Sequence, residues 1–132
     1  MKLLLRSVAG VVLGACVAGG VIILVELISG RMYPPPPGLD LRDPEVFRSY
    51  FENLPVGAFL MVLVAWGLGT FAGAWVCARI AGRLKVAHGL LLGALFLIAG
   101  VTNMLAIPHP AWMWASAFVV FGAGGYSGGR LA

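Results

Sequence analysis

Glu26 is the only acidic residue inside one of the long apolar segments of this 132-residue sequence. A carboxylate within a membrane-spanning segment is a functional-site hypothesis by default, because burying a charge in hydrocarbon is costly. Glu26 lies only about one helical turn, roughly 5 Å, from the end of its segment. It can therefore also reach the membrane interface or pair with Arg31. The functional and the interfacial interpretation both stay open.

Two further polar residues are predicted to lie at the same end of the molecule as Glu26. Asn103 is in the outer half of the third apolar segment, and His109 is in the short Pro-His-Pro turn that follows it. We interpret Glu26, Asn103 and His109 as a candidate polar vestibule at the outer end of a helical bundle.

The cysteines and histidines form no catalytic or metal-binding pattern. Cys16 and Cys77 lie on different segments at different predicted depths, so neither a CxxC motif nor a disulfide is expected. The tetrapeptide LGAC at 13–16 resembles a lipoprotein cleavage box, but the following residues stay apolar, which favours Cys16 as a small packing residue. His88 and His109 are predicted on opposite sides of the membrane. The sequence has no phosphate-binding loop or nucleophile elbow, so we expect no enzyme activity, no cofactor and no metal.

The segments that position these residues are strongly apolar, and the composition of the whole chain is that of an integral membrane protein. Hydrophobic residues make up 61% of the chain, charged residues 11%, and the mean hydropathy is +0.98. A membrane span needs about 20 apolar residues. We therefore predict an all-α integral membrane protein with one membrane domain, residues 1–132. Its four transmembrane helices are predicted at about 7–29, 56–80, 86–107 and 111–129, with an outer loop at 31–55.

Small residues recur at helical spacing in these segments. In the second segment, residues at every fourth position share one helix face; they are Ala65, Gly69, Gly73, Cys77 and Ala81. A face without bulky side chains lets a second helix approach closely, as in GxxxG packing. The glycines predicted to pack helices are Gly10, Gly14, Gly69, Gly73, Gly89, Gly93, Gly124 and Gly128.

The spacing also suggests an internal repeat. GAWVCARIA (73–81) aligns without a gap with GGYSGGRLA (124–132), and GVVLGA (10–15) resembles GLLLGA (89–94). We predict two tandem helical hairpins of the same orientation, related by an axis along the membrane normal. The alternative is that glycine- and alanine-rich spans resemble one another by composition alone.

The charged residues predict the orientation. Arg31, Arg42 and Arg48 share the 31–55 loop with four of the five acids, whereas the other basic residues flank the opposite ends of the spans. By the positive-inside rule both termini are cytoplasmic. We expect lipid head-group contacts from Arg79, Arg83, Lys85 and Arg130, and an affinity for anionic lipids. The net charge is +4, but the basic residues flank the spans and no aromatic residues alternate with them. We therefore expect no binding of nucleic acid.

The outer loop has local structure of its own. Pro34 to Pro37 predict a short polyproline II rod. Asp43-Pro44 is an N-cap followed by proline at the first helical position. The residues after it place one aromatic and apolar face on a helix over 44–54; they are Phe47, Tyr50, Phe51 and Leu54. We predict an amphipathic extracytoplasmic helix that lies on the outer membrane surface or caps the bundle, where it would form a lid over the vestibule; a plain linker with a helical turn is the alternative.

Four stretches carry a resemblance to a known family: PPPPGLDLRDPE (34–45), LPVGAF (54–59), GAWVCARIAGR (73–83) and the segment 103–114 that contains IPHP. With these, nearly the whole chain resembles a family of small, uncharacterised four-span bacterial inner-membrane proteins. The resemblance implies the bacterial inner (plasma) membrane and four helices, and it implies no activity and no catalytic residue.

Three classes of function remain open. The favoured one is a structural or interaction protein that packs through small-residue helix faces as a homo-oligomer or as an accessory subunit of a larger membrane complex. The alternative is a small proton-coupled transporter or channel subunit that uses Glu26. The chain resembles the small multidrug resistance transporters in size, but it has none of their motifs. A thiol enzyme that uses Cys16 and Cys77 is the least supported.

Overall fold

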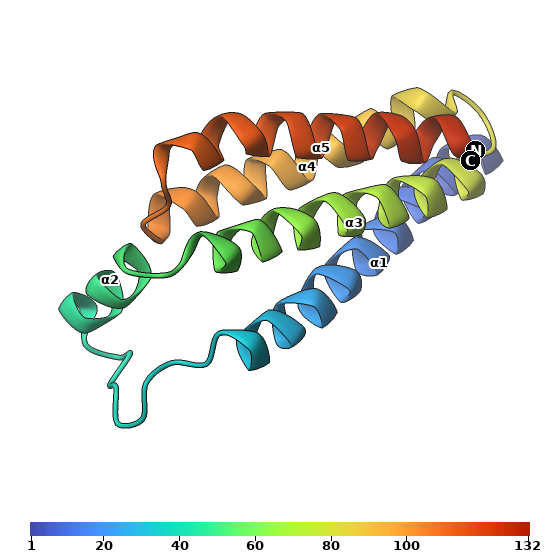
Figure 1. Cartoon of the computed structure of the whole chain (residues 1–132). Helices are drawn as coiled ribbons and strands as arrows, with labels where there is room; N and C mark the ends of the chain where they lie inside the picture. Colours follow the sequence, from blue (N-terminus) through green and yellow to red (C-terminus); the bar gives the residue numbers. More distant parts are fainter.

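A computed structural model describes all residues from 1 to 132, and its regular elements are α-helices throughout. They are α1 (Lys2–Met32), α2 (Pro44–Glu52), α3 (Val56–Ala81), α4 (Lys85–Ala106) and α5 (Ala111–Leu131). The four long helices run side by side, with α2 and its loop at one end and both chain termini at the other (Figure 1). The all-helical prediction is confirmed.

Three of the long helices, α1, α3 and α4, are long and apolar enough to cross a membrane. These candidate spans indicate a multi-pass membrane protein. The 21-residue α5 is not among them, because its many glycines, two serines and amphipathic aromatic residues lower its hydropathy. The fourth predicted span therefore stays a prediction.

Helix α3 is the centre of the bundle, since it contacts α1, α4 and α5, whereas α1 packs almost entirely against α3. The largest buried cluster joins α3 and α5 with the end of α4; its residues are Phe59, Trp66, Met104, Met113, Ala117 and Phe121. The rings of Trp66 and Phe121 stack at 5.1 Å between centroids. Gly100 of α4 makes room for this stack, because a Cβ there would lie 2.6 Å from the Phe121 ring.

Glycines bring the backbones of α1 and α3 into direct contact. A Cβ at Gly10 would lie 2.7 Å from the Cys77 carbonyl oxygen, and one at Gly14 would lie 2.8 Å from the Cys77 Cβ. On the facing helix, a Cβ at Gly69 would meet the Ala18 carbonyl oxygen at 2.8 Å. Such contacts under 3 Å exclude any side chain, so the two helices pack through their backbones.

Helix α5 uses two adjacent glycine rows for two different neighbours. A Cβ at Gly128 would lie 2.8 Å from the Ala74 Cβ of α3, as part of the row that starts at Gly124. In the other row, a Cβ at Gly125 would lie 2.7 Å from the Gly89 carbonyl oxygen of α4. Small residues on both sides are needed because α5 lies against α3 and α4 at once.

The two hairpins, which the sequence repeat predicts to be equivalent, differ in the contacts of some of their aligned glycines. The sequence repeat pairs Gly73 with Gly124, but Gly73 contacts α1, its partner within the hairpin, whereas Gly124 contacts α3. The row of α5 that faces its own hairpin partner is that of Gly125. Gly73 and Gly124 therefore do not make equivalent contacts. The aligned pairs Gly10–Gly89 and Gly14–Gly93 do, because each of these glycines faces the second helix of its own hairpin.

Polar contacts connect the helices at the end that carries the termini. Arg6 Nε donates to the Ile80 carbonyl in the last turn of α3 at 3.0 Å, where helix carbonyls lack partners of their own. Gly82 then ends α3 with φ of 70°, a left-handed conformation suited to glycine. His88 of α4 donates from Nδ1 to the Leu84 carbonyl, and its Nε2 accepts from the Ser7 hydroxyl of α1 at 3.0 Å.

The predicted short helix forms as α2, and it begins where the sequence indicates. The Asp43 carboxylate accepts from the backbone amides of Glu45 and Val46 at 2.9 and 3.4 Å. The helix ends at Glu52, two residues before the predicted boundary, and Leu54 lies outside it. Pro55 explains this difference, because proline disfavours a helical conformation at the residue before it.

Candidate functional site

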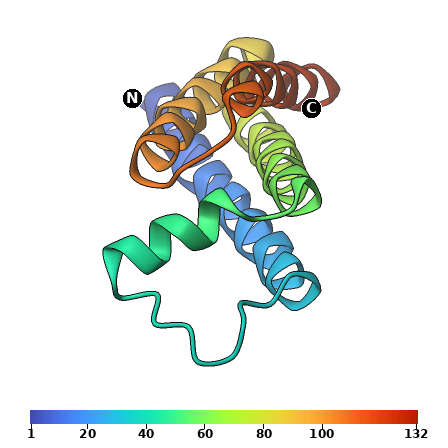
Figure 2. The ribbon, with the colours of Figure 1, turned by 60° about the vertical axis from the view of Figure 1, so that its left-hand side comes forward.

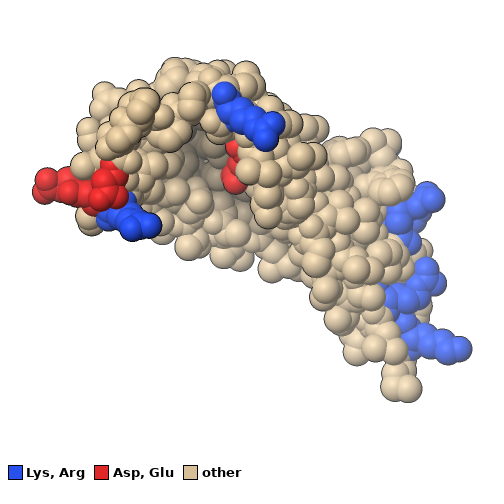
Figure 3. Space-filling model, turned by 90° about the horizontal axis from the view of Figure 1, so that it is seen from below, with Lys and Arg blue, Asp and Glu red and all other residues tan.

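The acidic residues lie at one end of the molecule together with Arg31, Arg42 and Arg48, and the other basic residues lie at the opposite end. We call the end with α2 and the loop the acidic end, because Asp40, Asp43, Glu45 and Glu52 lie there. The basic end carries the termini and the short α3–α4 turn; its charged residues are Lys2, Arg6, Arg79, Arg83, Lys85 and Arg130. Figure 3 shows basic side chains alone at one end and, towards the other, a hollow in the surface with acidic atoms in it and both acidic and basic side chains around it.

A cavity of about 330 Å³ lies under α2 at the acidic end, and we call it the Glu26 cavity. Its lining includes Glu26, Asn103 and His109, the residues of the predicted vestibule. They come from α1, from α4 and from the turn between α4 and α5. Residues of α2 and α3 complete the lining, among them Tyr50, Phe51 and Phe59.

The three polar side chains are not bonded to one another. Glu26 forms no ion pair, and the pairing with Arg31 that the sequence suggested is absent, since the one salt bridge of the structure joins Arg48 and Glu52. The Asn103 side chain forms no hydrogen bond either. The carboxylate and the amide are therefore free to accept hydrogen bonds from a further group.

His109 has a defined tautomer. Its Nδ1 lies 2.6 Å from the Ile107 carbonyl oxygen, which can only accept, so Nδ1 carries the proton. In the neutral ring Nε2 then has a free lone pair. The ring centroid lies 5.7 Å from that of Phe59 and 6.3 Å from that of Trp66, so aromatic side chains of α3 fix its position.

A second, smaller cavity continues from the first towards the middle of the bundle. Its volume is about 260 Å³, and Glu26 and Asn103 line it together with Trp66, Phe96 and Phe121. Apart from these two residues its lining is apolar. The carboxylate of Glu26 thus lies between a polar–aromatic cavity and an apolar one.

Helix α2 stands over this region without packing tightly on it. No Cα atom of α2 lies within 8 Å of a Cα atom of another helix, and Figure 2 shows α2 and its loop at the end of the four long helices. Tyr50 and Phe51 line the Glu26 cavity and are half-buried. Their rings form an edge-on pair with centroids 5.3 Å apart.

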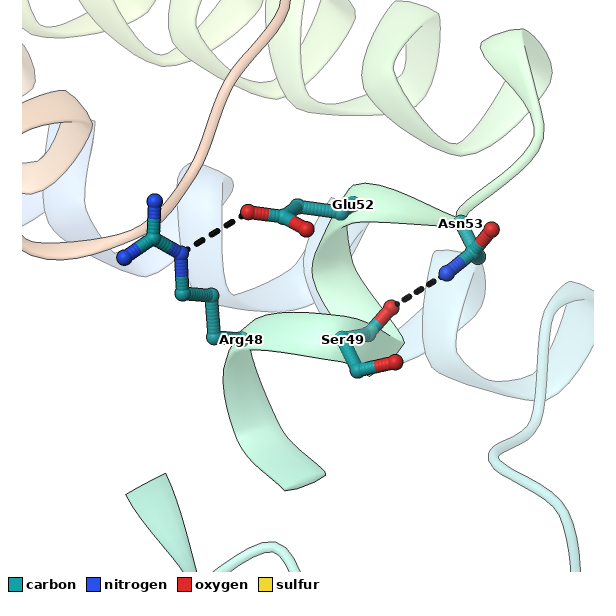
Figure 4. A network of polar contacts seen from close by, with 4 residues as sticks. All are labelled: Arg48, Ser49, Glu52 and Asn53. Atoms are coloured by element: carbon teal, nitrogen blue, oxygen red, sulfur yellow. Dashed lines mark hydrogen bonds and ion pairs between the residues drawn. The ribbon is translucent and has the colours of Figure 1, made fainter. Parts of the chain in front are cut away.

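The opposite face of α2 is held by exposed polar contacts (Figure 4). Arg48 Nε donates to the Glu52 carboxylate at 2.8 Å, and the Asn53 amide donates to the Ser49 carbonyl at 2.8 Å. The hydrogen bond to Glu52, helped by its charge, raises the pKa of Arg48 above its usual value. Both contacts stay within one turn, so they stabilise α2 without attaching it to the bundle.

The sequence did not predict two residues of this site, Tyr33 and Ser29. Tyr33, the C-cap of α1, lines the Glu26 cavity. Its hydroxyl lies over Gly57 of α3, where any Cβ would collide with it. Ser29, one turn before Tyr33, also lines the cavity. Their position at the end of the first apolar segment was the one available indication that they belong to the site. Their spacing from the other site residues gave none.

The residues predicted to contact lipid head groups are exposed at the basic end. Arg83, Lys85 and Arg130 border one open depression there. Lys85 Nζ donates to the Ala132 carbonyl at 2.8 Å, and the Arg79 guanidinium lies 5.3 Å from the centre of the Trp75 ring. The contacts leave these charged side chains exposed.

No group of three His, Cys, Asp or Glu side chains could hold a metal ion. Cys16 is exposed and Cys77 is buried against α1, and both are free thiols. Comparisons with protein-family models, with curated proteins and with solved structures find no match.

Proposed function

We propose that the protein spans a bacterial inner membrane four times, with α5 as the fourth span, and acts there as a structural or interaction protein. The charge separation supports cytoplasmic termini and an acidic end outside, since Lys and Arg concentrate on the cytoplasmic side. Packing of α5 against both α3 and α4 supports its place in the bundle. Anionic lipid head groups are the proposed partners of the basic end.

The observation that carries an interaction role is the uncovered surface of α1. Of its 31 residues only Gly10, Gly14 and Ala18 are buried. Gly20 also lies in mid-helix and is exposed, yet a Cβ there would meet nothing within 4 Å. Glycine weakens a helix by roughly 0.5–1 kcal/mol relative to alanine, and lipid does not require it. We therefore propose that a second helix, from another copy or from a larger complex, packs on α1.

Native mass spectrometry of the full-length protein in mild detergent tests this role. We expect more than one copy, or a second protein in fixed ratio, and a loss of that assembly in Gly20→Leu. Gly122→Leu is the matched control, because Gly122 of α5 also has open space around it. A protein that is monomeric and alone in every mild detergent would contradict the proposal.

The second candidate is a small proton-coupled transporter or channel subunit. It is favoured by the unpaired Glu26 in a cavity between helices. Proton-driven flux across liposomes that contain the purified protein would support it, provided that Glu26→Gln abolishes the flux and Asp40→Asn does not. Asp40 is a suitable control because it lies in the exposed loop. Equal flux in both variants would remove Glu26 from any transport mechanism.

A further inference from the structure

We propose that the Glu26 cavity binds a protonated amine that carries an apolar group. The ammonium would be held by Glu26, Asn103 and His109, and the apolar group would lie against the aromatic walls. This proposal rests on the membrane placement proposed above, and it requires neither oligomerisation nor transport.

The charge of the ligand follows from the lining. The cavity has one carboxylate and no lysine or arginine among its lining residues. The Glu26 side chain is exposed and has no opposite charge or hydrogen-bond donor from the protein, so it is accessible to a ligand that supplies both. The only formal charge in the lining is the carboxylate, which repels an anion and attracts a cation, so the complementary ligand is a cation.

The hydrogen-bonding groups narrow the class further. When ionised, Glu26 can only accept hydrogen bonds, the Asn103 carbonyl also accepts, and so does Nε2 of His109 in the tautomer whose Nδ1 donates to Ile107. The hydroxyls of Ser29, Tyr33 and Tyr50, which also line the cavity, can accept as well as donate. An ammonium group supplies N–H donors for such acceptors, as the lysine side chain does. A quaternary ammonium has no N–H to donate, so a primary or secondary amine suits this set better.

The remaining walls are suited to an apolar group. Tyr33, Tyr50, Phe51 and Phe59 line the cavity, and aromatic faces attract cations as well as apolar surface. The volume of about 330 Å³ is at the lower end of small-molecule sites, roughly 300–1,000 Å³. The adjoining apolar cavity of about 260 Å³, which shares Glu26 and Asn103, gives space for a longer chain.

An entry route lies beside α2. An open cavity of about 720 Å³ between the proline loop and α2 shares Tyr33, Tyr50 and Leu54 with the Glu26 cavity. Since the backbone of α2 stands clear of the other helices, the ligand can enter without separation of the four long helices.

Binding of a fluorescent primary amine, dansylcadaverine, to the full-length protein in phosphatidylcholine nanodiscs tests the proposal. Dansyl emission excited through the tryptophans reports occupancy, because Trp66 lines the adjoining cavity. We expect saturable binding that weakens at least tenfold in Glu26→Gln, recovers in part in Glu26→Asp, and stays within twofold in Asp40→Asn. The N-acetylated probe, which lacks the charge, should bind at least tenfold more weakly to the unmodified protein.

The amine site is disproved if no saturable binding occurs, if Glu26→Gln binds as tightly as the unmodified protein, or if the N-acetylated probe binds as tightly as the amine. A melting temperature of Glu26→Gln close to that of the unmodified protein excludes misfolding as the cause of weaker binding. Resistance to carbonate extraction from membranes tests the placement separately, so the two proposals can fail independently.

A second experiment distinguishes a lipid head group from a free amine as the ligand. Phosphatidylethanolamine carries a primary ammonium on its head group, whereas phosphatidylcholine does not. Competition with the probe when phosphatidylethanolamine is added to the nanodiscs assigns the site to a lipid head group. Unchanged probe binding assigns it to a free amine, and either result supports an ammonium site.

Discussion

The glycines of this protein differ in what surrounds them, and this difference decides what a side chain would do at each. A Cβ at Gly73 would lie 2.7 Å from the Ala18 Cβ and 2.9 Å from the Leu92 Cδ2, and one at Gly93 would lie 2.7 Å from the Phe121 carbonyl oxygen. A Cβ at Gly122 would have no neighbour within 4 Å. Only the first two positions hold helices together.

Leucine at Gly73 or Gly93 is therefore expected to destabilise the fold. Overpacking of this kind typically costs about 1–3 kcal/mol, and the contacts at both positions include backbone atoms that cannot rotate away. The melting temperature in detergent should fall for Gly73→Leu and Gly93→Leu and stay unchanged for Gly122→Leu. Equal melting temperatures for all three variants would mean that these helix faces do not pack.

Thr70 is the single buried side chain whose polar atom has no hydrogen-bond partner. It is fully buried in α3 beside Gly124 of α5. Leaving a buried hydroxyl unsatisfied costs about 1–3 kcal/mol, and valine has nearly the same shape. We expect Thr70→Val to keep or raise the melting temperature. A clear decrease would reveal a partner for the hydroxyl, such as a bound water.

At the scale of elements, α2 differs from the four long helices in how it is stabilised. Its own sequence supplies local stabilisation, through the Asp43 cap, proline at the first position and the Arg48–Glu52 pair. The long helices are held by close packing against one another. An element with local stability and no tight packing can move as a unit, which suits a cover over the Glu26 cavity.

Single cysteines on α2 should label with helical periodicity. In a background without Cys16 and Cys77, we expect positions 47 and 51 to react more slowly with a membrane-impermeant maleimide than positions 48 and 52. The physical reason is that Phe47 and Phe51 are half-buried while Arg48 and Glu52 are exposed. Adding Asp43→Ala should reduce the difference, since an N-cap is worth about 1 kcal/mol. Uniform labelling without that change would contradict a helical cover.

For the whole molecule, the position of the termini distinguishes three spans from four. Both termini lie at the basic end in Figure 1, and four spans would place them on the same side of the membrane. We expect a reporter fused after Ala132 to be active only in the cytoplasm and one inserted at Gly38 only outside. Activity of the C-terminal reporter only outside would show that α5 does not cross or that the orientation is reversed.

The sequence alone determined which segments are helical and most of their limits, because these depend on local features. The exceptions are α1, which extends beyond the predicted 7–29, and α2, which ends before Leu54. Apolar length predicts the long helices, and the Asp43-Pro44 pair and Pro55 fix the start and the limit of α2. The sequence also showed that most acidic residues lie in the 31–55 loop and most basic residues at the opposite ends of the spans, because this depends only on where the loops lie. Counting residues placed Glu26 about one turn from the end of its helix, but α1 continues to Met32, so Glu26 lies almost two turns, about 9 Å, from that end.

Only the tertiary structure decided which small face meets which helix and what surrounds Glu26. Gly124 and Gly125 are neighbours of the same type, and the sequence has no feature that assigns one to α3 and the other to α4. The absence of an Arg31 partner and the presence of Tyr33 at the cavity likewise depend on how side chains turn at a helix end. Helix faces become distinct only when the neighbours are in place, because a glycine carries no side chain by which a partner could be recognised.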